Sequence, residues 1–350
     1  MPSGARLKDI VASRYPNGNV WIGATTSYNA ISNQMIDAVI LNREFSFTTP
    51  ENDFKQSMVH PTPGSGWSWN HGDLFIDSAS KNRQVMRLHG PVSPQSSKWV
   101  LDDNRTGEDL EGMMREWVTA ICQRYNASPV VRWLDVVNET IEADGKWFGP
   151  KPGTEKWENP WTSMGADQDE NRTPLYISKA FELANQFAPR LKLVYNQHTS
   201  LEKAGVEKLK ETILYLKQKG LRVDAIGWQA HLAPTWHEDP QNLKTLSGLI
   251  SWAHQHQLEF HITENNIKIK KEVPGSQEFE SVRKEFYSAI FRVLLEHRET
   301  GVVGWNCWHV TDYESKKEGG FALLFDAKGA PTDAYYAVQA ILENPPAPIK

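Results

Sequence analysis

Two patterns of hydrophobic and polar positions alternate along the chain. Short runs of β-branched and aliphatic residues are separated by longer segments in which apolar residues recur with the period of a helix. In the segment 202–219, Val206, Leu209 and Ile213 form such an apolar stripe, and lysines and glutamates occupy the opposite face. The chain is therefore predicted to alternate between strands and amphipathic helices.

This alternation divides the chain into eight strands and eight helices, without an internal repeat or a low-complexity linker. The expected strands cover residues 20–26, 45–49, 84–89, 130–138, 192–196, 225–230, 259–264 and 302–308. The expected helices cover roughly residues 30–42, 72–82, 108–125, 175–187, 202–219, 240–256, 278–297 and 333–343.

Repeated strand–helix units favour a (β/α)8 TIM barrel, in which each helix connects two parallel strands. A doubly wound open sheet is the alternative. That fold usually carries a glycine-rich phosphate-binding loop after its first strand, and the stretch IGATTSYN is not such a loop. The whole chain, 1–350, is predicted to form one barrel domain.

Polar residues at the expected strand ends indicate what a barrel of this kind could bind. The carboxyl ends of all barrel strands meet at one mouth, so the side chains there converge. These positions are rich in carboxylates, amides, imidazoles and tryptophan, a set suited to a ligand with many hydroxyl groups. They are Glu51, Asn52, Lys55, His89, Asn138, Glu139, Asn196, Gln229, His231, Glu264 and Trp308.

Glu139 and Glu264 each end an apolar strand, so we expect them to face each other across the mouth. Cleavage of a glycosidic bond requires such a pair: one carboxylic acid protonates the leaving oxygen, and one carboxylate attacks or activates water. Asn138 could bind the hydroxyl next to the reacting carbon, and His231 could orient Glu264. The alternative for either glutamate is a polar rim residue whose hydrogen bonds are satisfied within the protein.

Composition and motifs exclude several other classes. A net charge of −5 with 23% charged residues does not indicate nucleic acid or an anionic membrane as a partner. No stretch approaches the apolar length of a membrane span. The histidines lack paired metal-binding spacing, and the sequence contains neither a Gly-x-Ser-x-Gly elbow nor a phosphate loop. We therefore expect no metal and no cofactor.

Four stretches of the chain resemble the motifs of glycoside hydrolase family 10, the retaining endo-β-1,4-xylanases. They are TPENDFK (49–55), DVVNE (135–139), ITE (262–264) and LLFD with AYYAV (within 323–338), in the right order over nearly the whole chain. The resemblance implies that Glu139 is the general acid/base, that Glu264 is the nucleophile, and that Asn138 holds the sugar 2-hydroxyl. It further implies sugar contacts by Glu51, Asn52, Lys55, His89, Gln229, His231 and Trp308.

The chain also departs from the family pattern at positions near the expected site. Where the family reads GHTLVWH, this chain reads LHGPVSP, so that Ser93 and Pro94 replace a tryptophan and a histidine. Asn266 replaces an aspartate behind the nucleophile, and His309 stands where the family usually has glycine. A decorated or mixed-linkage xylan-like glycan is therefore expected as an alternative to linear xylan.

A long segment rich in tryptophan, 140–173, follows Glu139. It contains Trp147, Trp157 and Trp161, together with too many prolines and glycines for a helix. A loop of this length in a compact domain is usually functional or disordered. Two interpretations remain open: the rings shape the leaving-group side of the site, or they hold the loop against the barrel.

From these observations we expect a retaining glycoside hydrolase that acts by double displacement on a polysaccharide or oligosaccharide. The alternatives are a hydrolase of another β-glycan and a carbohydrate-binding protein that has kept the cleft without turnover. We further expect a monomer. Because a polymer cannot easily enter a cell, we expect a secreted or periplasmic protein whose signal peptide is absent from this sequence.

Overall fold

The computed structural model of the chain describes residues 2–62, 64, 66–102, 104–149, 159–269, 276–315 and 321–349. Its main strands are β1 (Val20–Thr26), β2 (Phe47–Pro50), β3 (Val85–Leu88), β4 (Val131–Asn138), β5 (Lys192–Gln197), β6 (Ala225–Trp228), β8 (Glu259–Lys268) and β9 (Val303–Cys307). The strand order β8-β6-β5-β4-β3-β2-β1-β9 returns to its start, since β8 also pairs with β9. This closed order, with helices between the strands, is that of a (β/α)8 barrel and confirms the fold expected from the sequence.

The described helices are α1 (Leu7–Arg14), α2 (Tyr28–Ser32), α3 (Ile36–Glu44), α4 (Gln56–Val59), α5 (Asn70–Lys81), α6 (Gly107–Tyr125), α7 (Leu175–Phe187), α8 (Lys203–Gln218), α9 (Pro240–Gln255), α10 (Gln277–Glu296), α11 (Asp312–Ser315) and α12 (Asp333–Glu343). The expected helix 30–42 is in fact two helices, α2 and α3. The residue Gln34 between them has a φ of +51°, which a right-handed helix cannot accommodate. Helix α1 was not expected, and it buries Leu7, Ile10 and Val11.

The chain divides into two compact units, which are described one at a time. The first unit comprises Met1–Thr49, Asp77–Val85 and Ile226–Lys350, and the second unit comprises Pro50–Ile76 and Met86–Ala225. The expectation of a single domain over the whole chain stays a prediction.

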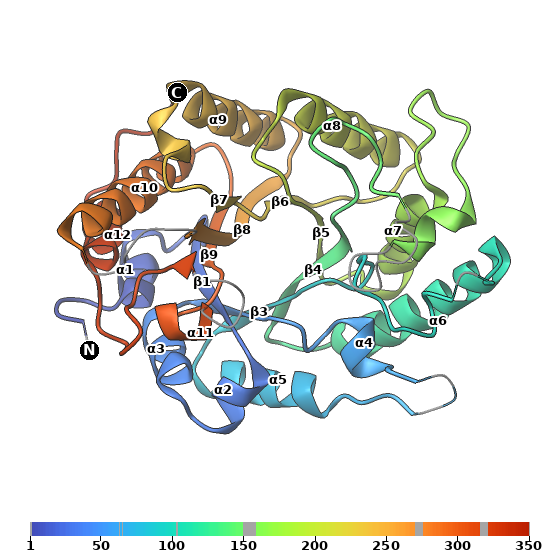
Figure 1. Ribbon diagram of the computed structural model, residues 1–350, viewed down its shortest axis with the longest axis horizontal. Helices are drawn as coiled ribbons and strands as arrows, with labels where there is room; N and C mark the ends of the chain where they lie inside the picture. Colours follow the sequence, from blue (N-terminus) through green and yellow to red (C-terminus); the bar gives the residue numbers. More distant parts are fainter. Residues whose placement is uncertain are drawn as a thin grey trace. The chain divides into compact units, whose positions relative to one another are not determined.

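The first unit is built on the parallel pairs β1–β9 and β9–β8. Helices α10 and α12 pack side by side in this unit (Figure 1). In its core, the ring of Trp305 in β9 makes edge contacts with Tyr287 and Phe291 of α10. Gly23 in β1 has no room for a side chain, because a Cβ there would lie 2.4 Å from the ring of Phe47.

The second unit is built on the parallel strands β3, β4 and β5, and helices α6 and α7 pack side by side within it (Figure 1). Helix α6 begins at a capping box. The N–H of Asp109 donates to Oγ1 of Thr106 at 3.1 Å, and the N–H of Thr106 donates to the Asp109 carboxylate at 2.9 Å. Farther along α6, the indole N–H of Trp117 donates to the carbonyl of Pro91, which ties the helix to the segment that follows β3.

Strand β8 extends beyond the strand 259–264 that the sequence indicated. Its last residues pair in parallel with the short strand β7 (His231–Leu232) and antiparallel with β10 (Phe321–Ala322). The prediction that Glu264 ends the strand is therefore wrong, since Glu264 lies inside β8. His231 of β7 pairs with Asn266, and Phe321 of β10 pairs with Lys268, so the two short strands supply partners for the backbone of this extension.

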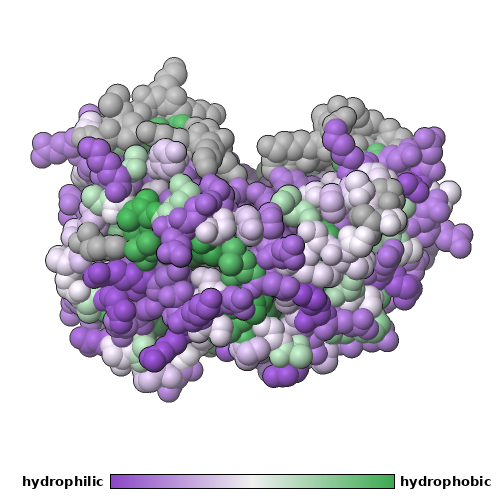
Figure 2. All heavy atoms as spheres, turned by 90° about the horizontal axis from the view of Figure 1, so that it is seen from below, coloured by the Kyte–Doolittle hydropathy of each residue, from purple (hydrophilic) through white to green (hydrophobic). Residues whose placement is uncertain are grey.

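The surface of the protein is mainly hydrophilic on the face that Figure 2 shows, with hydrophobic residues in small groups. Among the described residues, the exposed large hydrophobic side chains are Ile36, Val39, Met58, Tyr313 and Tyr336. None of the described helices is long and apolar enough to cross a membrane.

Candidate active site

The second unit places Asn138 at the end of β4 and Glu139 directly after it, as the sequence indicated. Asn196 of β5 contacts both residues. Its Nδ2 donates to Oδ1 of Asn138 at 2.8 Å, and its carbonyl accepts the N–H of Glu139 at 3.3 Å. Glu139 is half-buried and has a φ of +58°, in the left-handed region that costs a residue with a side chain of order 1–3 kcal/mol. The backbone therefore holds Glu139 in a strained turn at the strand end.

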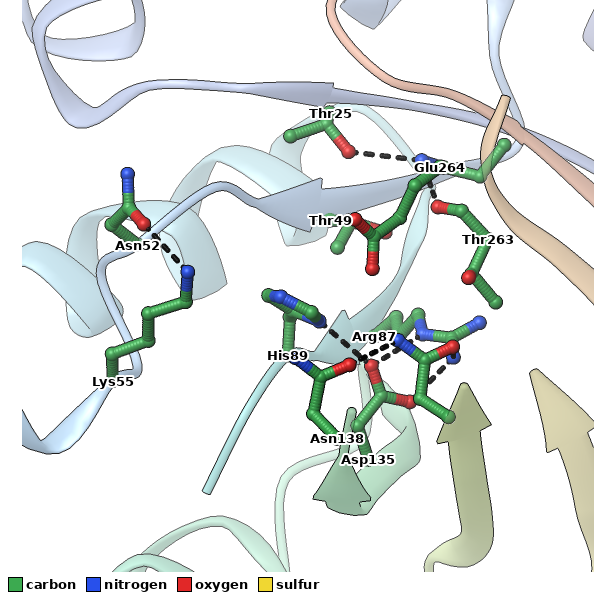
Figure 3. A network of polar contacts seen from close by, with 12 residues as sticks. Thr25, Thr49, Asn52, Lys55, Arg87, His89, Asp135, Asn138, Thr263 and Glu264 are labelled. Atoms are coloured by element: carbon green, nitrogen blue, oxygen red, sulfur yellow. Dashed lines mark hydrogen bonds and ion pairs between the residues drawn. The ribbon is translucent and has the colours of Figure 1, made fainter. Parts of the chain in front are cut away.

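A buried ion pair lies close to these residues in the same unit (Figure 3). Asp135 in β4 accepts from Nε of Arg87 at 3.0 Å and from Nη2 of Arg87 at 2.5 Å. The other partner of Asp135 is His89, whose Nδ1 lies 2.9 Å from Oδ2. All three side chains are buried. Because the carboxylate accepts at Nδ1, it fixes the tautomer and the orientation of His89.

Glu51, Asn52 and Lys55 follow β2 and form a hydrogen-bonded row. Nδ2 of Asn52 donates to Oε1 of Glu51 at 2.9 Å. Nζ of Lys55 donates to Oδ1 of Asn52 at 2.8 Å (Figure 3). Lys55 also donates to Oε1 of Gln95, which lies in the segment after β3. These contacts hold the lysine ammonium in one position although its side chain is long.

The segment that carries Ser93 and Pro94 contacts a tryptophan of the long loop. The indole N–H of Trp161 lies 3.3 Å from the carbonyl of Ser93 and 3.1 Å from Oγ of Ser96. Trp161 is fully buried, so its ring packs inside the second unit rather than facing solvent. These contacts favour the interpretation in which this ring holds the loop.

Trp147 belongs to the same loop and is half-buried. Its indole N–H donates to the carbonyl of Asn171 at 2.9 Å, and Nζ of Lys208 lies 5.4 Å from the ring centre. This ring is thus held at one edge and covered on one face. Trp157, the third ring of the loop, lies outside the described residues.

In the first unit, the buried Glu264 lies beside His231. Oε2 of Glu264 is 3.0 Å from Nε2 of His231, and Nδ1 of His231 is 3.0 Å from Oδ1 of Asn266. This arrangement follows from strand pairing, since β7 and β8 run parallel with His231 next to Asn266. The three residues therefore form one chain of contacts that ends at a carboxylate.

Trp308 and Gln229, the other two expected sugar contacts of the first unit, are both buried. The ring of Trp308 meets the ring of His231 edge-on, with 6.0 Å between the ring centres. Two neighbouring residues have left-handed backbones: Ala230, with a φ of +60°, follows Gln229, and His309, with a φ of +79°, follows Trp308. Strained residues of this kind cluster at functional sites.

A buried polar network supports the strand that carries Glu264. Nδ2 of Asn306 donates to Oγ1 of Thr25 at 2.9 Å and to the carbonyl of Thr263 at 2.8 Å, and its Oδ1 accepts from Thr49 at 3.2 Å. Figure 3 shows the three threonines of this network and Glu264. The network holds the residue that precedes Glu264 and so limits the movement of the carboxylate.

His309 is buried and lies near a second buried glutamate of the first unit. Its Nδ1 is 3.9 Å from Oε2 of Glu314. The carboxylate of Glu314 accepts from Oγ1 of Thr26 at 2.9 Å and from the N–H of Ser27 at 3.2 Å. Burial raises the pKa of Glu314, whereas the neighbouring His309 lowers it. The imidazole at this position therefore packs inward against a hydrogen-bonded carboxylate.

Three residues that support this site were missed in the sequence: Arg87, Asp135 and Asn306. Arg87 stands two positions before His89 along an extended segment, so the two-residue period of a strand could have placed both on one face. Within the part of the chain that the structure covers, no group of three or more His, Cys, Asp or Glu side chains could hold a metal ion.

Comparison with known proteins identifies the family. The model of glycosyl hydrolase family 10 matches residues 11–341. Endo-1,4-beta-xylanase A of Caldicellulosiruptor sp. (strain Rt8B.4) is 27% identical over 335 residues, which cover 91% of this chain and 45% of that protein. The chain thus spans about half of the length of this relative. Endo-1,4-beta-xylanase A of Caldicellulosiruptor saccharolyticus is 28% identical over 85% of this chain and 87% of its own length.

Solved structures share the fold. Xylanase 10B from Thermotoga petrophila, in complex with xylobiose, is 23% identical and superposes with a TM-score of 0.81 over 98% of both chains. A family 10 structure from Paenibacillus barcinonensis is 23% identical and gives a TM-score of 0.82 over 96% of this chain and 97% of that one. The chain therefore belongs to glycosyl hydrolase family 10 and is a glycoside hydrolase.

Proposed function

We propose that the protein is a retaining hydrolase of β-1,4-xylosidic bonds in xylan or a xylan-like polysaccharide, with Glu264 as nucleophile and Glu139 as general acid/base. The observation that carries this proposal is the orientation of Glu264, a buried carboxylate whose Oε2 lies 3.0 Å from an imidazole nitrogen of His231. Relatives named endo-1,4-beta-xylanases and a structural relative in complex with xylobiose support the substrate class.

The reaction takes place in two displacements. In the first, a carboxylate oxygen of Glu264 forms a bond to the anomeric carbon while the bond to the leaving sugar oxygen breaks, and the proton of Glu139 passes to that oxygen. In the second, Glu139 takes a proton from water, the water oxygen bonds to the anomeric carbon, and Glu264 leaves as a carboxylate. Two inversions give net retention of configuration.

The substrate is bound by the polar residues around the two glutamates. In the second unit, these are the hydrogen-bonded row that contains Lys55, the imidazole of His89 held by Asp135, and the amide of Asn138. Each group is held by another protein group, so little side-chain entropy remains to be lost when a sugar hydroxyl binds. The proposed sugar-binding residues of the first unit are Gln229, His231 and Trp308.

The range of substrates that the protein accepts depends on the segment in which Ser93 and Pro94 replace two ring side chains of the family pattern. We propose that decorated or mixed-linkage xylans are accepted for this reason, and another β-glycan is the alternative. Because such polymers lie outside cells, we propose that the protein is secreted or periplasmic. We further propose that it acts as a monomer.

Release of reducing ends from linear xylan, substituted xylans and mixed-linkage β-glucan tests the proposal. The substitution Glu264→Gln should lower kcat by at least about 10³-fold, as expected for a nucleophile. Glu259→Gln is the matched control, since Glu259 is a buried glutamate of the same strand and also lies 3.1 Å from a histidine nitrogen, that of His261. Equal losses in both variants, or no release from any xylan, would contradict the proposal.

A further inference from the structure

The side chain of Gln197 continues the pairing between β4 and β5 beyond the end of β4. Gln197 is the last residue of β5 and is buried. Its Oε1 accepts the N–H of Thr140 at 3.0 Å and the N–H of Ile141 at 3.3 Å. Its Nε2 donates to the carbonyl of Ile141. One carboxamide therefore binds three backbone groups on the two residues that follow Glu139.

The orientation of this carboxamide is determined by the backbone groups that it meets. Two N–H donors require the oxygen of the amide, and a carbonyl requires its nitrogen. Nε2 has a second hydrogen, and Nδ1 of His198 lies 3.2 Å away as its acceptor. Turning the amide over would break all of these contacts. The backbone of Thr140 and Ile141 is thus held in one position relative to β5.

The backbone held in this way belongs to the turn that carries Glu139. On the side before this turn, Asn138 donates its N–H to the carbonyl of Val92 at 2.9 Å, and Glu139 donates to the carbonyl of Asn196 at 3.3 Å. On the side after it, Gln197 supplies the acceptor for the next two N–H groups. Glu139 itself has a φ of +58°, a conformation that persists only where the surrounding structure over-determines it.

We propose that Gln197 is a positioning residue for Glu139, and this inference rests on the proposed role of Glu139 as general acid/base. The direction in which a side chain leaves the backbone depends on the φ of its residue, so a relaxed turn would move the carboxyl group. General acid catalysis requires that group within hydrogen-bond reach of the leaving oxygen. By holding the two residues after Glu139, Gln197 keeps the acid in place for proton transfer.

The alternative is that Gln197 only satisfies buried backbone groups and has no effect on the proton transfer. Gln84 in the first unit is a glutamine of that kind. It is buried, and its Nε2 donates to the carbonyl of Leu41 at 3.1 Å and to that of Phe45 at 3.0 Å. Neither of these residues adjoins a proposed site residue in the sequence. The two glutamines therefore form a matched pair, of which one binds the backbone beside Glu139.

The test compares two aryl β-xylobiosides whose leaving groups differ in their need for a proton. Phenolate requires the general acid, whereas dinitrophenolate leaves without protonation. The substitution Gln197→Met keeps the length of the side chain and removes its hydrogen bonds. It should lower kcat/KM for the phenyl substrate by about 10²-fold, as expected when a catalytic group is misplaced, and leave kcat/KM for the dinitrophenyl substrate almost unchanged. Gln84→Met is the control and should not change the ratio of the two values.

Glu139→Ala separates this inference from the proposed function, because it should show the same dependence on the leaving group more strongly. If it does so while Gln197→Met lowers kcat/KM equally for both substrates, or for neither, the inference is overturned and the role of Glu139 stands. If Glu139→Ala affects both substrates equally, the assignment of the acid/base is wrong and the inference fails with it.

Gln197→Asn is the second variant, for use if Gln197→Met does not fold. It keeps the amide but shortens the side chain by one carbon, so that the contacts with Thr140 and Ile141 cannot all be kept. The phenyl substrate should again lose more of its kcat/KM than the dinitrophenyl substrate. An equal loss for both substrates would overturn the inference.

Discussion

Replacing Asp135 by Asn should destabilise the protein strongly, although the two side chains have nearly the same shape. The carboxylate of Asp135 is 0% exposed and pairs with the guanidinium of Arg87, which is 1% exposed. The substitution leaves that cation buried without its counter-charge, and breaking such a pair costs about 3–5 kcal/mol. Because the amide oxygen of Asn can still accept one hydrogen bond, we expect the lower end, about 3 kcal/mol.

A loss of about 3 kcal/mol corresponds to a change of about 100-fold in the folding equilibrium. For a unit of the size of the second unit, which contains Asp135, this loss of stability should lower the Tm by at least about 6 °C. Calorimetry or circular dichroism can measure the change. Turnover of the proposed substrate, xylan, should also fall, because a neutral amide replaces the carboxylate that lies 2.9 Å from Nδ1 of His89.

Asp73→Asn provides the matched control for this substitution. Asp73 also pairs with an arginine, Arg124, at 2.5 Å, but the two side chains are 47% and 37% exposed. An exposed pair contributes about 0–1 kcal/mol, so this variant should have almost the Tm of the unsubstituted protein. If Asp73→Asn and Asp135→Asn lower the Tm by similar amounts, burial does not determine the strength of these pairs and the reasoning is refuted.

Three further predictions concern the stereochemistry, the pH dependence of stability and the substrate. The first product should keep the anomeric configuration of the substrate when the reaction is followed by proton NMR, and an inverted first product would contradict the role given to Glu264. Burial, and to a lesser extent the neighbouring His254, lowers the pKa of His297 from 6.5 to about 4. Because the unfolded imidazole binds its proton near its ordinary pKa, the free energy of unfolding should decrease as the pH falls from 6.5 to about 4. Over this pH range the urea midpoint should decrease less in His297→Gln than in the unsubstituted protein. Equal decreases would rule out His297 as the cause. Substituted xylan should be cut at least as well as bare xylan, relative to an ordinary family member, since Ser93 and Pro94 replace two ring side chains. A clear preference for unsubstituted xylo-oligosaccharides would count against that explanation.

The sequence predicted those elements whose limits depend on local signals. Helices α7 and α12 have the expected limits, 175–187 and 333–343, because turn residues and an apolar stripe close to each helix define them. The extension of β8 to Lys268 depends instead on pairing with residues far away in the chain. The break at Gln34 is set by one backbone angle, which the apolar period does not reveal.

The candidate site was accessible to sequence reasoning only in part. Glu139 and Glu264 were singled out because each was expected to end an apolar strand, where a carboxylate is unusual. Asp135 stands inside such a run, and its partner Arg87 lies on another strand, so the stretch alone did not show that the charge is paired. Asn306 was hidden in the same way between the apolar residues Trp305 and Cys307, although its side chain contacts threonines of three other strands.

The left-handed backbone of His309 has a consequence for the history of this position. A glycine would adopt a φ of +79° without strain, so random mutation back to glycine would be favoured by stability alone. A histidine is strained there, so its side chain must contribute stability or function, and one contact that it makes is with the buried carboxylate of Glu314. In related sequences, histidine at position 309 should therefore occur together with an acidic residue at position 314, and the two should be lost together. Relatives with histidine and no acid would show that something other than this pair has kept the imidazole in place.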